Sequence, residues 1–330
     1  RQPSWARFPL GNGPFKLSRP MVANQAIVLT PNALHAGGHP KVAQVALEIY
    51  NDVAASYAAW RAGRLDWSAY PPDRMAEVRR HYRSSSVIRP TAGLDGLVLD
   101  EGSAPARNPL FRQAVSLAVD RAAIARGVLA NAVLPAAGLV PALVPGAAAG
   151  GGASPCPSCG FDPARARSLL AQSGVTVTAV FPIAFAPGTG QEAWAGVVAA
   201  ALKTNLGIDA RAVPATGAGP PPGGAEALTR VMRYPTPDDF LEALVATGRP
   251  DNTSGYRNPA LDTLLAAGKG MSDPGARGAQ YQQAERLALA DLPVIPLFWQ
   301  RGIRVGRVKA WKGLGMDAFG NPTLASVAPK

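Results

Sequence analysis

Three neighbouring segments decide the fold: VTVTAV at 175–180, QEAWAGVVAAAL at 191–202 and IDARAV at 208–213. The first and third alternate along the chain in the way that is typical of a strand with one buried face. The middle segment repeats apolar residues at the spacing of one helix face. These residues are Trp194, Val197, Val198, Ala201 and Leu202. The order strand, helix, strand predicts an α/β unit in which the helix packs on the strands.

The same alternation continues toward both ends of the chain. The N-terminal part predicts, in order, a strand over 42–50, a helix from Asp52 to 63, a short strand at 65–67, a helix over 73–80 and a strand over 94–99. Toward the C-terminus, 292–299 is an apolar strand. Because strands and helices interleave throughout, the predicted fold class is α/β.

Besides the start at Asn108-Pro109, three helix starts carry an Asx residue followed by Pro. The Asx side chain caps the first turn, and Pro is suited to the first helical position. The pairs are Asp162-Pro163, Asn258-Pro259 and Asp273-Pro274. A further long helix is expected over 109–130, and an irregular surface connection rich in Ala, Gly and Pro over 135–160.

Composition excludes several classes of protein. The 330 residues, 47% of them apolar and 17% charged, suffice for two folded domains with a substantial core. No run of eighteen apolar residues occurs, so no membrane-spanning segment is predicted. The net charge of +11 is dispersed and is not interleaved with stacking aromatic residues, which favours a solvated basic face over nucleic-acid binding.

The two cysteines lie in Pro-Cys-Pro-Ser-Cys-Gly, as Cys156 and Cys159. One CxxC supplies only half of a zinc site, and a thioredoxin-like site would place it after a strand at the start of a helix. We therefore expect a small structural disulfide in an exported protein, with metal binding or redox chemistry as the alternatives.

Motifs of catalysis are missing from the sequence. It contains no GxSxG elbow, no phosphate-binding Walker loop and no dinucleotide GxGxxG. Asp238 and Asp239 are adjacent, and helix capping explains Asp238 better than acid–base chemistry. We expect no catalytic residue, no metal and no cofactor.

The segment 230–261 combines turn-forming Pro, Asp, Asn and Gly with isolated aromatic residues and a few charges. Loops on a rigid scaffold are where binding groups usually lie. This segment is therefore the candidate ligand-binding loop.

Motifs spread along nearly the whole chain resemble extracellular solute-binding proteins of family 5, the oligopeptide- and dipeptide-binding components of ABC importers. The matching strings are GNGPFKL (11–17), PN…HPKV (31–42), AGRLD (62–66), NPLFRQA…AVDR (108–121), FDPARA (161–166), PTPDDF (235–240), SGYRNP (254–259) and LPVIPL (292–297). Eight strings in the order of the family make the resemblance specific.

The resemblance implies a two-lobed type II periplasmic-binding-protein fold, with mixed sheets flanked by helices and a hinge between the lobes. Residues 1–99 and 300–330 would form lobe I, and 100–299 lobe II. Family members carry a further N-terminal portion ahead of the string at 11–17, so we expect that this sequence lacks it.

The function implied is capture of a small peptide-like or anionic solute in an interlobe cleft, followed by delivery to a membrane permease. The expected location is extracytoplasmic, in the periplasm or as a cell-surface lipoprotein, and a monomer is expected. The alternative is a non-transporting relative that acts as a scaffold or regulator in envelope or secondary-metabolite biosynthesis.

The candidate loop departs from the peptide-binding members at two positions. Those members read W-x-x-D-Y, and the Asp pairs with the α-ammonium of the peptide; this sequence has Arg230 and Arg233 at the Trp and Asp positions. A guanidinium repels an ammonium and suits a planar anion. We expect Arg233, and secondarily Arg230, to bind an anionic group of the ligand, unless a register shift makes both surface residues. The other candidate contacts are Tyr234, Tyr256, Asn252 and Ser254.

Overall fold

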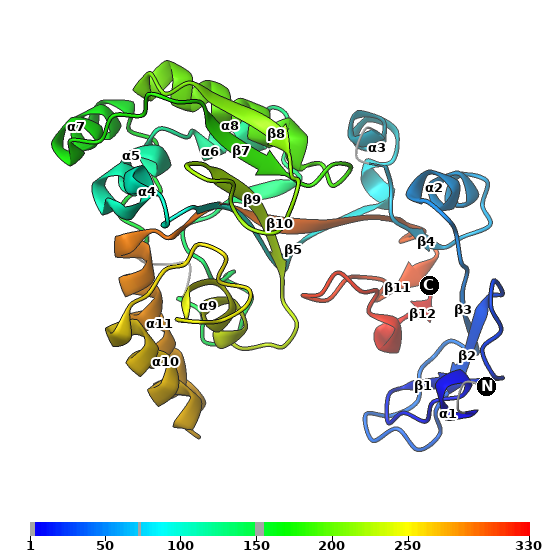
Figure 1. Cartoon of the computed structure of the whole chain (residues 1–330). Coiled ribbons are helices and arrows are strands. Elements are labelled where there is room, and N and C mark those ends of the chain that lie inside the picture. Colours follow the sequence, from blue (N-terminus) through cyan, green and yellow to red (C-terminus); the bar gives the residue numbers. More distant parts are fainter. Residues whose placement is uncertain (1–3, 72–73, 149–154) are drawn as a thin grey trace. The chain divides into compact units, whose positions relative to one another are not determined.

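The computed structural model describes residues 4–71, 74–148 and 155–330, and the chain forms two compact units. One unit comprises Arg1–Arg89 and Gly302–Lys330, and the other comprises Pro90–Arg301. The chain passes from one unit to the other within two long strands, β5 (Ser86–Leu99) and β10 (Val294–Gly306) (Figure 1). The sequence prediction had placed these divisions near residues 99 and 300.

The first unit contains a small antiparallel sheet of β1 (Phe15–Leu17), β2 (Ile27–Pro31) and β3 (Val45–Leu47). Helix α2 (Val53–Arg61) begins as predicted, because the Asp52 carboxylate accepts a hydrogen bond from Ala55 N at 2.6 Å. This unit also contains α1 (Ser4–Arg7), β4 (Trp67–Ser68), α3 (Met75–His81), β11 (Trp311–Lys312), β12 (Ala328–Pro329) and the short 3-10 helices η2 (Arg83–Ser85) and η3 (Leu324–Ser326).

The second unit is built on a mixed sheet with the strand order β10-β5-β9-β7-β8. Strands β5 and β9 (Ala225–Val231) are antiparallel, from Gly93 opposite Val231 to Leu99 opposite Ala225. Strand β7 (Phe181–Phe185) is parallel to both β8 (Ala210–Pro214) and β9, and β6 (Val133–Pro135) pairs with β10.

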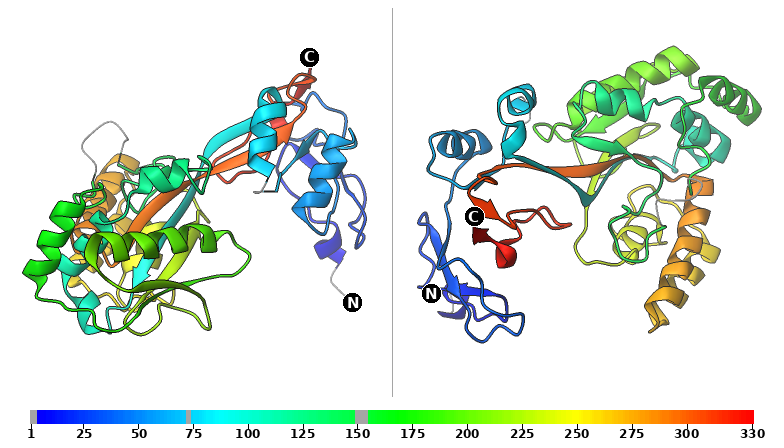
Figure 2. Two further views of the ribbon diagram at one scale, coloured as in Figure 1. Left: turned by 90° about the horizontal axis from the view of Figure 1, so that it is seen from above. Right: turned by 180° about the vertical axis from the view of Figure 1, so that it is seen from behind.

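Two groups of helices flank this sheet in the second unit (Figures 1 and 2). One group includes α5 (Pro109–Leu117), α7 (Pro163–Ser173) and α8 (Gln191–Leu206). The other consists of α9 (Asp238–Val245), α10 (Pro259–Gly270) and α11 (Pro274–Asp291). The three Asx-Pro starts are confirmed, since Asp162, Asn258 and Asp273 each accept a backbone N–H of the following turn.

Two of the sequence predictions for this unit are wrong in detail. The alternating segment 175–180 lies outside the sheet, and the strand is the following β7, whose apolar residues are more deeply buried. The predicted helix over 109–130 is divided into α5 and α6 (Arg121–Arg126), with α4 (Ala104–Arg107) preceding them. The division falls at Asp120, whose side chain caps α6 through Ala123 N instead of continuing the preceding helix.

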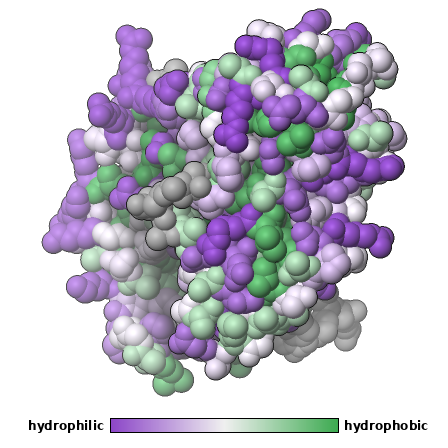
Figure 3. Space-filling view, turned by 90° about the vertical axis from the view of Figure 1, so that its left-hand side faces the viewer, coloured by the Kyte–Doolittle hydropathy of each residue, from purple (hydrophilic) through white to green (hydrophobic). Residues whose placement is uncertain are grey.

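Helix α8 confirms the helix that was predicted from the apolar spacing of residues 191–202. Trp194, Val198 and Leu202 are buried, whereas Val197 is exposed, so the buried face is narrower than predicted. On the face of the molecule in Figure 3, hydrophilic side chains are interspersed with small apolar patches. Among the described residues, the helices are too short or too polar to cross a membrane.

Candidate functional site

The candidate segment 230–261 is not a loop throughout, since it contains the end of β9, the whole of α9 and the start of α10. A recess of about 260 Å³ lies in the second unit between the turn after β9, α9 and the turn that follows α9. It is lined by Arg230, Arg233, Tyr234, Asp238, Asp239, Glu242, Ala243, Arg249, Pro250 and Asp251. The structure therefore brings three of the predicted ligand-binding residues, Arg230, Arg233 and Tyr234, to one cavity.

The path of the chain explains why these residues meet. Strand β9 remains paired with β5 up to Val231, and Met232 N still donates to Ala92 O at 2.8 Å. The chain then turns through two prolines and enters α9, whose first turn contains Asp238 and Asp239. Negative charge at this position is favourable because the N-terminus of a helix carries partial positive charge.

Asp239 connects both arginines of the loop to the first turn of α9. Its side chain is 0% exposed, and one carboxylate oxygen accepts from Arg230 Nη2 at 2.7 Å. The other oxygen accepts from the backbone N of Arg233 at 2.5 Å. Asp239 therefore stabilises the loop itself. The prediction that Asp238 caps α9 is wrong, since Pro237 is the N-cap residue and no side chain caps this helix.

Both arginines of the loop also contact a second carboxylate. Asp251 Oδ2 lies 2.9 Å from Arg230 Nη1 and 3.1 Å from Arg233 Nη2. Arg233 Nε additionally lies 3.4 Å from Asp239 Oδ1. Arg230 is largely buried with 11% of its side chain exposed, whereas the Arg233 side chain is 62% exposed. The two arginines and two aspartates thus form a formally neutral cluster, which we call the Arg–Asp quartet.

The edge of the recess carries Tyr234 and a second ion-pair group. Tyr234 is exposed, and its hydroxyl donates to Asp238 Oδ2 at 3.3 Å. Partial burial and the nearby Asp238 charge raise the pKa of Tyr234 to about 12, so the hydroxyl stays protonated at neutral pH. Arg249 pairs with Glu242, whose other oxygen lies 3.4 Å from Lys269 Nζ.

The three remaining predicted residues do not line the recess. Asn252, Ser254 and Tyr256 form a connected turn in which their polar groups bind one another. Asn252 Nδ2 donates to the carbonyls of Ala246 and Tyr256, and Ser254 Oγ donates to Asn252 Oδ1 at 2.7 Å. Ser254 and Tyr256 are 3% and 4% exposed. Their evident role is to shape the loop.

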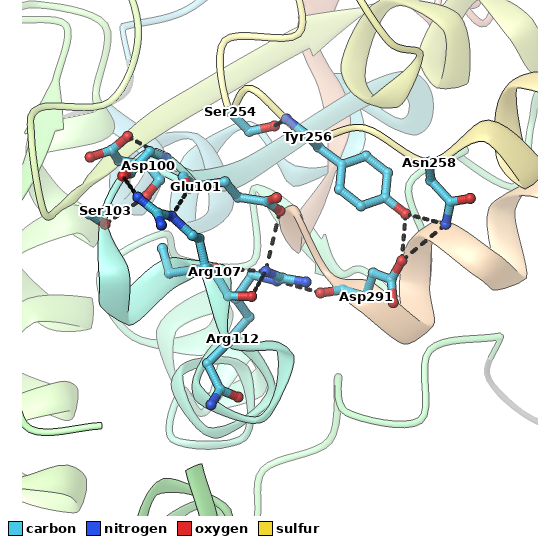
Figure 4. A network of polar contacts seen from close by, with 12 residues as sticks. Asp100, Glu101, Ser103, Arg107, Arg112, Ser254, Tyr256, Asn258 and Asp291 are labelled. Carbon is cyan, nitrogen blue, oxygen red and sulfur yellow. Dashed lines mark hydrogen bonds and ion pairs between the residues drawn. The ribbon is translucent and has the colours of Figure 1, made fainter. Parts of the chain in front are cut away.

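Tyr256 joins this turn to a buried polar network that the sequence analysis missed (Figure 4). Its hydroxyl lies 2.5 Å from Asp291 Oδ2, and Asn258 Nδ2 donates to both oxygens. Burial and the hydrogen bond to Asp291 raise the pKa of Tyr256 above its usual range. The Tyr256 hydroxyl is therefore used in hydrogen bonds within the second unit.

Arg112 and Glu101 form another part of the network in Figure 4. Arg112 Nη1 lies 3.4 Å from Glu101 Oε1 and donates to Ala106 O, and both side chains are largely buried. Burial lowers the pKa of Arg112 and raises that of Glu101, and each partner opposes the shift of the other. Helical spacing places Arg112 on the same face as Val115 and Ser116, which is the signal that could have indicated its burial.

Cys156 and Cys159 form the predicted disulfide, with their Cα atoms 5.4 Å apart. Because both sulfurs are used in this bond, neither is a thiolate ligand for a metal in this state. Among the described residues, no cluster of three or more His, Cys, Asp or Glu side chains is arranged to hold a metal ion.

A larger cavity, of about 530 Å³, lies in the first unit and was not predicted. Its lining is mainly apolar and includes Val45, Trp67, Trp311 and Leu324. The indole of Trp311 donates to Asp66 Oδ1 at 2.9 Å. None of the predicted ligand-binding residues borders this cavity.

Comparison with known proteins identifies relatives of the chain. Residues 3–248 match the family described as bacterial extracellular solute-binding proteins, family 5 Middle. The chain is 28% identical over 314 residues to a protein of Brucella ovis named as an ABC transporter peptide-binding protein, covering 88% of this chain and 56% of that one. It is 24% identical over 323 residues to the periplasmic murein peptide-binding protein MppA of Escherichia coli, covering 92% and 57%.

The fold agrees with a solved structure of MppA in its unliganded open form, with a TM-score of 0.81 at 21% identity. The match covers 99% of this chain and 65% of that one. The fold is therefore that of a type II periplasmic binding protein, as predicted. The chain spans a little over half the length of the Brucella ovis and Escherichia coli relatives.

Proposed function

Because this chain belongs to the bacterial extracellular solute-binding proteins of family 5, we propose that it captures a small peptide-like or anionic solute for the permease of an ABC importer. The observation that carries this proposal is the match over residues 3–248, together with the shared fold. Relatives named as peptide-binding proteins support a peptide-like ligand. A binding role without catalysis agrees with the family, and each of the three arginines in the recess is paired with a carboxylate.

The recess at the Arg–Asp quartet is the proposed ligand contact in the second unit. Arg233 offers an exposed guanidinium at its edge, and Tyr234 offers an exposed ring and hydroxyl. The largely buried Arg230 shares the Asp239 and Asp251 carboxylates with Arg233. A guanidinium binds a carboxylate through paired N–H donors. We propose no direct contact for Asn252, Ser254 and Tyr256, because their bonds within the turn support a role in holding the loop.

The proposed location is outside the cytoplasm. The Cys156–Cys159 disulfide supports it, since such bonds persist in oxidising compartments. We further propose that the two units act as the lobes of the fold and that β5 and β10, which continue from one unit to the other, serve as the hinge. Small-angle scattering with and without ligand would detect such a motion as a decrease in the radius of gyration.

The ligand class is tested by calorimetry with a panel of short peptides, each in its free, N-acetylated and C-amidated form. If Arg233 binds a ligand carboxylate, N-acetylation leaves the affinity unchanged, and C-amidation weakens it by about tenfold or more, as expected for loss of a charge-assisted hydrogen bond. Arg233→Asp reverses the preference in favour of free amino termini. Tight binding of unmodified peptides that this substitution leaves unaffected would contradict the anion contact.

Capture itself has a separate test. Native mass spectrometry of the freshly purified protein is expected to show a co-purified small molecule that is released on denaturation. A protein that carries no such molecule, and that binds nothing in the peptide panel or in a panel of small acids, would contradict the capture function.

A further inference from the structure

The two carboxylates of the Arg–Asp quartet differ in their surroundings. Asp239 is 0% exposed and is tied to the backbone of Arg233 as well as to both guanidinium groups. Asp251 contacts the same two guanidinium groups through a single oxygen, and its side chain is 49% exposed. One carboxylate is thus a fixed part of the loop, whereas the other lies at the edge of the recess in contact with water.

We propose that Asp251 occupies the position of a ligand carboxylate, and that a bound ligand displaces it from Arg230 and Arg233. The inference rests on the proposed solute-binding function and adds a residue that controls access to the anion position. In the ligand-free state Asp251 keeps both guanidinium groups paired. In the bound state the ligand carboxylate makes the contacts to Arg230 and Arg233 that Asp251 Oδ2 makes in the ligand-free state.

The bonding of the surrounding turn allows this exchange. Asn252, the next residue, holds the turn through its bonds to Ala246 O and Tyr256 O, at 3.0 and 2.9 Å. Asn252 N also donates to Arg249 O. Rotation of the Asp251 side chain toward water therefore breaks two ion pairs and leaves these bonds intact.

Charge balance explains why a carboxylate is the favoured occupant. With Asp251 in place, two arginines face two aspartates and the quartet is neutral. When Asp251 turns away, the remaining three groups carry one net positive charge. A ligand carboxylate neutralises this charge and accepts paired hydrogen bonds from the planar guanidinium groups. A ligand ammonium would add to the positive charge.

Competition with Asp251 also lowers the apparent affinity. A ligand that binds only when Asp251 has turned away finds its site in a fraction of the molecules. Its apparent affinity is the intrinsic affinity multiplied by that fraction. Removing the Asp251 carboxylate is therefore expected to strengthen binding of a carboxylate at this position. Loss of a structural ion pair alone would not have that effect.

Chemical rescue tests the exchange without requiring knowledge of the transported solute. In Asp251→Ala, sodium acetate should fill the vacated position and raise the thermal midpoint by an amount on the order of 2 °C beyond its effect on the parent. The rise should saturate with concentration, and sodium chloride at the same ionic strength or acetamide should not reproduce it. Adding Arg233→Gln to Asp251→Ala should abolish the acetate response.

Two further variants make the outcome decisive. Asp238→Ala removes a neighbouring carboxylate of the same recess that contacts Tyr234 and Thr236, and it should gain no acetate response. Asp251→Asn retains the shape of the side chain and serves if the alanine variant is poorly folded; it should respond to acetate more than the parent does. Equal responses to acetate in the parent and both Asp251 variants would overturn the inference. A positive acetate response together with no ligand in the capture tests would instead count against the proposed function alone.

Discussion

Arg230 Nη2 lies 2.7 Å from the carboxylate of Asp239, a side chain with no exposed surface, and this ion pair joins the end of β9 to the first turn of α9. The same carboxylate accepts the backbone N of Arg233. One buried charge therefore determines both the shape of the loop and the position of its two arginines.

Replacing Asp239 with Ala is expected to destabilise the protein by about 3 kcal/mol, because it leaves the mostly buried Arg230 with only one of its carboxylate partners. Urea denaturation measures the loss. Asp238→Ala is the matched control, since Asp238 is the preceding residue and only half buried, and it should cost less than about 1 kcal/mol. Equal losses in the two variants would contradict the structural role of Asp239.

Tyr256→Phe separates a structural from a ligand-binding role for this residue. Its hydroxyl lies 2.5 Å from Asp291 Oδ2 inside the network of Figure 4, so its removal should cost about 1 to 3 kcal/mol of stability. Ligand affinity should change by less than about twofold. Tyr234→Phe is the control at the recess, and it should leave stability nearly unchanged. A large loss of affinity in Tyr256→Phe without loss of stability would restore Tyr256 as a ligand contact.

Glu285 should make the protein less stable as pH rises through neutrality. Burial raises the pKa of this carboxyl from 4.5 to about 7, although the backbone N–H groups of Val140 and Leu139 oppose the shift. The folded state therefore binds the proton more tightly than the unfolded state does. Stability from this group is fully present below about pH 4.5 and is lost as pH rises through 7.

Glu285→Gln should remove this dependence. The difference in the free energy of unfolding, variant minus parent, is expected to be about 2 kcal/mol larger at pH 8 than at pH 5. Denaturant unfolding of both proteins at both pH values measures it. Glu192→Gln, at an exposed position in the first turn of α8, should show no such gain. Parallel pH profiles for the parent and Glu285→Gln would exclude Glu285 as the cause.

The disulfide is expected to contribute modestly to stability, because Cys156 and Cys159 are only three positions apart. Closing so short a loop removes chain entropy worth about 2 kcal/mol in the unfolded state. A reducing agent should therefore lower the thermal midpoint of the parent, and Cys159→Ala should start near this lower value and not respond to the reductant. A response of the variant equal to that of the parent would contradict this assignment.

Local features of the fold could be predicted from the sequence because they depend on residues within one helical turn. Asp162, Asn258 and Asp273 cap their helices through backbone N–H groups two or three positions later. The α8 segment was predicted from its own periodicity. The predicted helix over 109–130 failed at Asp120 because a capping residue inside an apolar pattern ends one helix and begins the next.

The candidate recess was only partly predictable. The sequence identified the loop and its two unusual arginines, and the structure brings Arg230, Arg233 and Tyr234 to one cavity. The polar character of the segment 230–261 also predicted Asn252 and Ser254 as ligand contacts, but their side chains form hydrogen bonds within the turn. Composition does not distinguish a polar group that faces a ligand from one that shapes the loop, because both occur in turn-rich segments.

The sequence by itself determined the α/β class, the helix starts and the family resemblance, since these depend on spacing and order along the chain. Only the tertiary structure decided which charges meet. Asp251 lies 21 residues beyond Arg230 and 18 beyond Arg233, yet it contacts both. That contact depends on how β9, α9 and the following turn pack together, and packing brings distant residues within the few ångströms over which an ion pair acts.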